Sequence, residues 1–159
     1  MGKTKFNVLI LSIVDVFFWS IMIGLGETYI SAFSLSFGFS ERYSGLVGVV
    51  PFGLASIIQI FSTKIFSRFR TRKNIVVFCA FMQALCLFSL ILQPNDIPWA
   101  KEGLIVILIA YWFFGMASGP FWNAWLVSII PSKKLPNFFA KRGMVNQLVL
   151  IATLVGAGH

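Results

Sequence analysis

The sequence predicts an all-α membrane protein that crosses the bilayer with five helices. Five long apolar stretches carry this prediction, because most approach the roughly 17–25 residues that a helix needs to cross a bilayer. The 159 residues are 58% hydrophobic and only 11% charged, whereas a soluble domain of this length needs a more polar surface. We expect one transmembrane helical domain over residues 1–159, with spans at residues 8–30, 45–61, 75–92, 104–130 and 145–158.

The distribution of charge predicts the orientation in the membrane. All but two of the 13 Lys and Arg residues precede the first stretch, or lie between the second and third or the fourth and fifth. These segments fall on the same side of the bilayer, and the positive-inside rule makes that side the cytoplasm. We therefore expect a multi-pass protein of the cell's inner (plasma) membrane with a cytoplasmic N-terminus. Contact with lipid explains the net charge of +8, and we expect no nucleic-acid partner.

The first stretch carries an aspartate near its middle. Placing Asp15 there costs roughly 2.5–3.5 kcal/mol on insertion. Ionisable groups inside a membrane mark substrate or ion pathways by default, so Asp15 is a candidate coupling or binding carboxylate, with Trp19 on the same helix face. The alternative is a structural carboxylate bonded to a neighbouring helix. Glu27 lies nearer the outer end, where it either joins the pathway or reaches water.

The second stretch has a face of small residues that ends in an amide. Gly45 and Gly48 fall on this face and are candidates for close packing against another helix. Gln59 follows at helical spacing and either lines a polar cavity or bonds to a neighbouring helix. The linker that comes next is strongly basic between Lys64 and Lys73, which favours an orientation signal and contact with anionic lipid, with a gating role as the alternative.

The last two stretches contain further packing and polar candidates. Residues 93–99 predict an outer turn between the third and fourth stretches. Gly115 and Gly119 form a small-xxx-small pair that indicates close helix packing. Asn123 and Gln147 either line a polar cavity or make interhelical hydrogen bonds.

The basic linker resembles the loop between the second and third helices of the major facilitator superfamily. That loop typically reads Gly-x-x-x-Asp-Arg-x-Gly-Arg-(Arg/Lys). Arg68 takes the place of the first Arg, Thr71 and Arg72 take the place of the basic pair, and Lys73 lies just beyond. Ser67 stands where the acid belongs, so the charge contacts that this acid makes in the family are not expected here.

A second segment looks like a branch of bacterial members of the same superfamily. Residues 119–125 read Gly-Pro-Phe-Trp-Asn-Ala-Trp, which is similar to the Gly-Pro-x-Trp-Asn-x-Trp at the end of the family's fourth helix. Phe139 and Arg142 match the segment that follows, whereas Ser128 replaces an acid. The resemblance covers the whole chain in helix order.

The resemblance implies part of a secondary transporter. The family fold has twelve helices in two halves, each built from two inverted three-helix repeats, and five helices would make a partial half. A small solute would cross by alternating access, with a missing transporter half or further copies of this chain completing the cavity. Asp15 would couple transport to an ion or bind the solute, and Gln59, Asn123 and Gln147 would support it. On this basis we expect the sequence to be truncated or incomplete.

Two other interpretations stay open. In the first interpretation, the chain is a small non-transporting membrane scaffold or accessory subunit. In the second, it is a degenerate inactive remnant of a transporter. The sequence contains no Gly-rich phosphate loop, no nucleophile elbow and no His/Cys cluster. We therefore expect no enzymatic activity, no cofactor and no metal.

Overall fold

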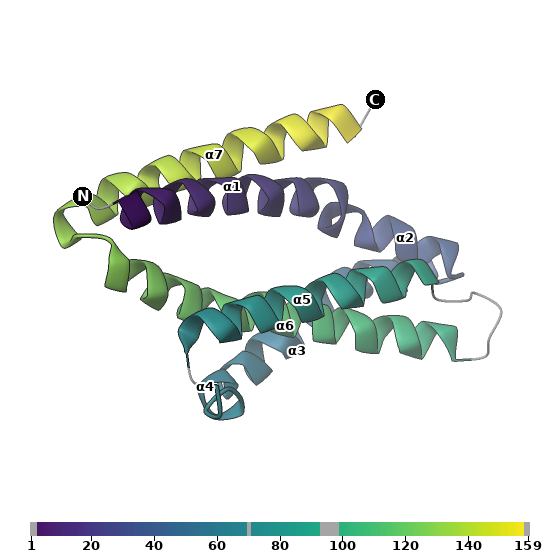
Figure 1. Ribbon diagram of the computed structural model, residues 1–159. Helices are drawn as coiled ribbons and strands as arrows, with labels where there is room; N and C mark the ends of the chain where they lie inside the picture. The colour runs from purple at the N-terminus through teal and green to yellow at the C-terminus, as the bar shows by residue number, and fades with distance from the viewer. Residues whose placement is uncertain (1–2, 70, 93–98, 158–159) are drawn as a thin grey trace. The chain divides into compact units, whose positions relative to one another are not determined.

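The computed structural model describes residues 3–69, 71–92 and 99–157, and the described residues form helices joined by turns, without strands (Figure 1). The all-α class is thereby confirmed. Most of the predicted turn at residues 93–99, and Gly158 at the end of the fifth expected span, lie outside the described residues. The elements are α1 (Lys3–Leu25), η1 (Glu27–Tyr29), α2 (Ile30–Ser36), α3 (Glu41–Gln59), α4 (Ser62–Ile65), α5 (Arg72–Leu92), α6 (Ala100–Ile129), η2 (Ser132–Lys134) and α7 (Leu135–Ala157).

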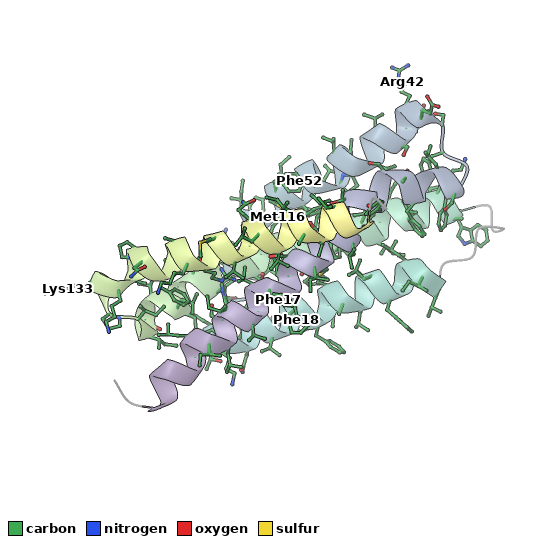
Figure 2. All side chains as sticks on the ribbon, turned by 90° about the horizontal axis from the view of Figure 1, so that it is seen from above. Phe17, Phe18, Arg42, Phe52, Met116 and Lys133 are labelled. Atoms are coloured by element: carbon green, nitrogen blue, oxygen red, sulfur yellow. The ribbon has the colours of Figure 1, made fainter. Side chains whose placement is uncertain are left out.

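Four described segments are long and apolar enough to cross a membrane. They are Val8–Ser36, Arg72–Leu92, Ala100–Ile129 and Ser132–Ala157. Large apolar side chains project from them, including Phe17 and Phe18 on α1 (Figure 2), as a lipid-facing surface requires. Helix α3 is not among the four, because it begins with Glu41 and Arg42 and ends with Gln59. The described residues therefore form a helical protein with four segments compatible with membrane spans.

Two helix boundaries differ from those expected. Helix α1 ends at Leu25, and Gly26 separates it from the 3-10 turn η1, because glycine there weakens the regular helix. Helix α7 begins at Leu135 rather than at residue 145, with Pro136 in its first turn, where a proline removes no needed hydrogen bond. The early start of α7 places Arg142 on a helix instead of in a linker.

The contacts divide the chain into two compact units, which are described separately. One unit contains residues 1–30 and 126–159, and the other contains residues 31–125. In the first unit α1 and α7 lie side by side (Figure 1).

The second unit has an aromatic core between α5, α6 and the turn after α4. Phe66 is 4% exposed and packs with Ile75, Cys79 and Ala117. The rings of Phe69, Phe78, Phe113 and Phe121 surround it, with centroids 5.6–6.2 Å from its own.

Replacing Phe66 by leucine should lower the free energy of unfolding by about 1 kcal/mol, because leucine cannot keep the four ring contacts. The same change at Phe81, which is 58% exposed on α5, removes no core contact and is the matched control. Thermal unfolding followed by circular dichroism in detergent measures both. Equal melting temperatures for the two variants would contradict the aromatic core.

The contacts also fix the helix directions in the second unit. Phe52 of α3 meets Trp112 of α6, and Gln59 donates to the Met116 carbonyl at 3.0 Å, so α3 and α6 run parallel. Arg72 at the start of α5 donates to the Ala124 carbonyl of α6 at 3.2 Å. Gln83, farther along α5, lies against Gly115, which is earlier in α6, so α5 and α6 are antiparallel.

Candidate functional site

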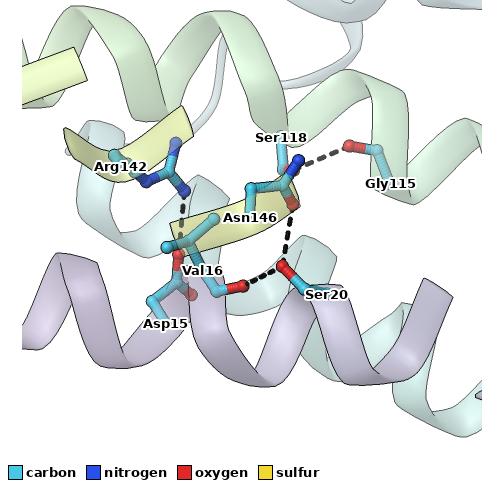
Figure 3. A network of polar contacts seen from close by, with 7 residues as sticks. All are labelled: Asp15, Val16, Ser20, Gly115, Ser118, Arg142 and Asn146. Atoms are coloured by element: carbon cyan, nitrogen blue, oxygen red, sulfur yellow. Dashed lines mark hydrogen bonds and ion pairs between the residues drawn. The ribbon is translucent and has the colours of Figure 1, made fainter. Parts of the chain in front are cut away.

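An ion pair joins α1 to α7. Arg142 Nη2 donates to Asp15 Oδ2 at 3.1 Å (Figure 3). Asp15 comes from the apolar part of α1, and Arg142 lies about two turns into α7. The Arg142 side chain is 20% exposed and the Asp15 side chain is 50% exposed. The guanidinium therefore neutralises a carboxylate that would otherwise stand alone in an apolar helix.

A polar contact follows one turn farther along the same two helices. Ser20 Oγ lies 2.8 Å from Asn146 Oδ1 and 2.6 Å from the Val16 carbonyl (Figure 3). A hydroxyl has one proton, so it can donate to only one of these oxygens. Both contacts become hydrogen bonds when the Asn146 amide is turned so that its NH₂ group donates to Ser20 while Ser20 donates to Val16.

The third contact is a close approach of small residues. A Cβ built on Gly24 would collide with the side chain of Thr153, lying 2.7 Å from its Cβ atom. The three contacts pair Asp15 with Arg142, then Ser20 with Asn146, then Gly24 with Thr153. Residue numbers rise together on both helices, so α1 and α7 are parallel.

The contact face of α1 is one that our sequence reasoning missed. Ser12, Val16 and Ser20 are each less than 5% exposed, and Gly24 is also buried. These residues repeat every four positions and so form one ridge of small side chains, which permits close helix packing. From the sequence alone, Asp15 and Trp19 are instead singled out on this helix. The four-residue spacing of small side chains is the signal that identifies this ridge.

The other expected pathway residues are divided between the units. Trp19 is partly buried on α1, and Glu27 lies in the first turn of η1. Gln147 is exposed on α7, whereas its neighbour Asn146 makes the contact with α1. Gln59 donates to α6, and Asn123 is exposed on that helix.

The four expected packing glycines behave in two ways. A Cβ on Gly48 would lie 2.7 Å from Ser31 Oγ, and one on Gly115 would lie 2.7 Å from Gln83 Nε2. A Cβ on Gly45 or Gly119 would meet no atom within 4 Å in the described part of the chain. Close approach therefore occurs at one glycine of each expected pair.

The basic motif residues all lie at the surface. Arg68, Arg72 and Lys73 are exposed, and Arg72 alone among them is tied to another helix, through its hydrogen bond to the Ala124 carbonyl.

Ser118 Oγ donates to the Gly115 carbonyl within α6 at 2.7 Å (Figure 3).

No family model, no curated protein and no solved structure matches this chain. The contacts between α1 and α7 define the candidate site. The Asp15 carboxylate, half exposed beside a guanidinium, has the chemistry to exchange Arg142 for a proton or another cation.

Proposed function

We propose that this chain is part of, or derived from, a secondary active transporter that moves a small solute by alternating access. The ion pair between Asp15 and Arg142 carries this proposal, because paired charges within apolar spans commonly mark ion or substrate pathways. Half of the Asp15 side chain is exposed, which leaves it open to a ligand or a coupling ion. The two motif resemblances to the major facilitator superfamily point the same way.

We further propose five crossings of an inner membrane, with the N-terminus in the cytoplasm. Parallel α1 and α7 cross in the same direction, which requires an odd number of crossings between them. Antiparallel α5 and α6 account for two, and α3, which runs parallel to α6, supplies the third. Its 19 residues extend about 28 Å, close to the roughly 30 Å hydrocarbon thickness.

Single-cysteine labelling tests this topology. Starting from C79A/C86A, we expect S67C and S132C to react with a membrane-impermeant maleimide only when the reagent has access to the cytoplasmic side of the membrane. S40C should react from the outer side, because α3 separates it from Ser67. All three serines are exposed. Labelling of S40C and S67C from one side would contradict a crossing by α3.

The transport proposal is tested by uptake in cells that express the full chain. A panel of radiolabelled sugars, amino acids and organic cations is offered with and without a proton ionophore, and the D15N variant is measured beside the wild type. We expect at least one solute whose accumulation depends on both Asp15 and the ion gradient. Accumulation indifferent to D15N would contradict the role of Asp15, and no accumulation of any solute would contradict transport by this chain.

A scaffold or accessory subunit is the second candidate, and the exposure of α7 favours it. None of the residues of this helix is buried, and its exposed side chains include Met144, Leu148, Ile151 and Val155 at steps of four, three and four. Such a stripe suits either lipid or the helix of a partner protein. Recovery of a stoichiometric partner together with no solute flux in liposomes would favour this function over transport.

A further inference from the structure

The basic segment, which we define as residues 60–69 and 71–73, is anchored to the core of the second unit. Phe66 is buried at its centre, among aromatic rings from α5 and α6. Its backbone is turned by hydrogen bonds from Phe66 N to the Ser62 carbonyl and from Phe69 N to the Phe66 carbonyl. The cationic side chains nearby are therefore carried by an ordered backbone instead of a loose linker.

Helix α4, within the basic segment, lies across the direction of the long helices α5 and α6. Figure 1 shows α4 nearly end-on where α5 and α6 are seen from the side. If α5 and α6 cross a bilayer, α4 then lies along its surface. Ile60, Phe61 and Ile65 are 73%, 54% and 49% exposed around it. Exposed apolar side chains beside basic ones are typical of a segment placed at the lipid interface.

The cations of this segment are available to a partner. Lys64, Arg68 and Lys73 are exposed, and within the described residues none of their side chains has an ion pair or hydrogen bond. Arg72 is engaged with the Ala124 carbonyl and holds the segment against α6. Three cationic side chains without a protein partner, on α4, the turn after it and the start of α5, lie in a segment with exposed apolar side chains and match a ligand with a negative head and an apolar tail.

We propose that the basic segment binds an anionic phospholipid. Lys64, Arg68 and Lys73 contact the phosphate headgroup, and the exposed apolar side chains of residues 60–65 contact the acyl chains. A free phosphate ion would gain nothing from those apolar side chains, so the lipid is the occupant that the surface fits. The binding depends on membrane residence alone and holds whether or not the chain transports a solute.

Native mass spectrometry of the full chain tests the proposal. The protein is purified from equimolar phosphatidylglycerol and phosphatidylcholine, and the retained lipids are counted. The K64Q/R68Q/K73Q variant is compared with K133Q/K134Q/K141Q, which removes the same charge from another exposed basic segment. We expect wild type and control to retain phosphatidylglycerol preferentially. The first variant should lose that preference more than tenfold, since each interfacial cation contributes roughly fivefold.

A second variant separates lipid from free phosphate and does not depend on the charge changes. F61S/I65S keeps every cation, and we expect it to retain less phosphatidylglycerol than the wild type. In a second measurement, we expect inorganic phosphate at about physiological ionic strength not to displace the lipid from the wild type. Equal losses in both triple variants would overturn the proposal, because general electrostatics would then suffice. Displacement by inorganic phosphate, with F61S/I65S unaffected, would also overturn it in favour of a phosphate ion.

Discussion

Replacing Arg142 by alanine should lower the stability of the α1–α7 pair by about 2–3 kcal/mol. The change leaves the Asp15 carboxylate in an apolar helix without the guanidinium that donates to it at 3.1 Å. Breaking a fully buried pair costs about 3–5 kcal/mol, and the half-exposed Asp15 side chain places this pair below that range. Thermal unfolding in detergent, followed by circular dichroism, measures the loss. A melting temperature equal to that of the wild type would show that the pair does not hold the helices together.

Exchanging the two charges separates a structural role of Asp15 from a functional one. D15R/R142D keeps an ion pair between the same helices, and we expect it to recover most of the stability lost in R142A. D15N/R142Q removes both charges and should also stay near wild-type stability, because no charge is left unpaired. If Asp15 couples transport to an ion or binds the solute, neither double variant accumulates solute as the wild type does. Recovery of both stability and transport by the exchange would instead assign Asp15 a purely structural role.

The sequence was sufficient to predict the helical class and to single out Asp15, but not to identify Arg142 as its partner. Long apolar stretches indicate membrane spans because the hydropathy of a span depends only on consecutive residues of the chain. Which residues of two helices meet depends on their rotation and register, which one sequence does not contain. The sequence alone therefore assigns Arg142 to a linker motif, whereas the structure places it opposite Asp15.

The start of α7 shows a similar limit. Residues 138–142 are less apolar than the rest of the span, and hydropathy alone placed them in the preceding linker. They are nevertheless helical, and α1 lies beside this helix and supplies the partner of Arg142. Tertiary contact thus extends a helix beyond its apolar stretch, which propensity and hydropathy do not register.

The glycines illustrate why spacing alone did not identify the tightest packing. Gly115 and Gly119 have the spacing typical of helix packing, yet only Gly115 has a close neighbour. Gly24 belongs to no such glycine pair, and its neighbours in the ridge are two serines and a valine. A mixed ridge of small side chains permits the same close approach as paired glycines, so a search restricted to glycine overlooks it.

Substituting Gly24 by alanine should therefore lower the stability of the α1–α7 pair by about 2 kcal/mol, in the range of an overpacked core. The new methyl group would collide with Thr153, whose hydroxyl lies 2.9 Å from both the Val149 and the Leu150 carbonyl and donates to one of them, which restrains the side chain. The helices must then separate, which also lengthens the contacts of Ser20 and Asp15 with α7. Thermal unfolding in detergent measures this effect.

The matched control is G143A on the partner helix, because a Cβ there meets nothing within 4 Å among the described residues. Alanine is the better helix former, so G143A should leave stability unchanged or raise it by up to about 1 kcal/mol. The double variant G24A/T153G removes the colliding side chain and should regain most of the loss, less the cost of a new glycine in α7. If G24A proved as stable as G143A, the parallel packing of α1 and α7 at Thr153 would be wrong. The parallel direction, and the odd number of crossings inferred from it, would then depend on the Asp15–Arg142 and Ser20–Asn146 contacts alone.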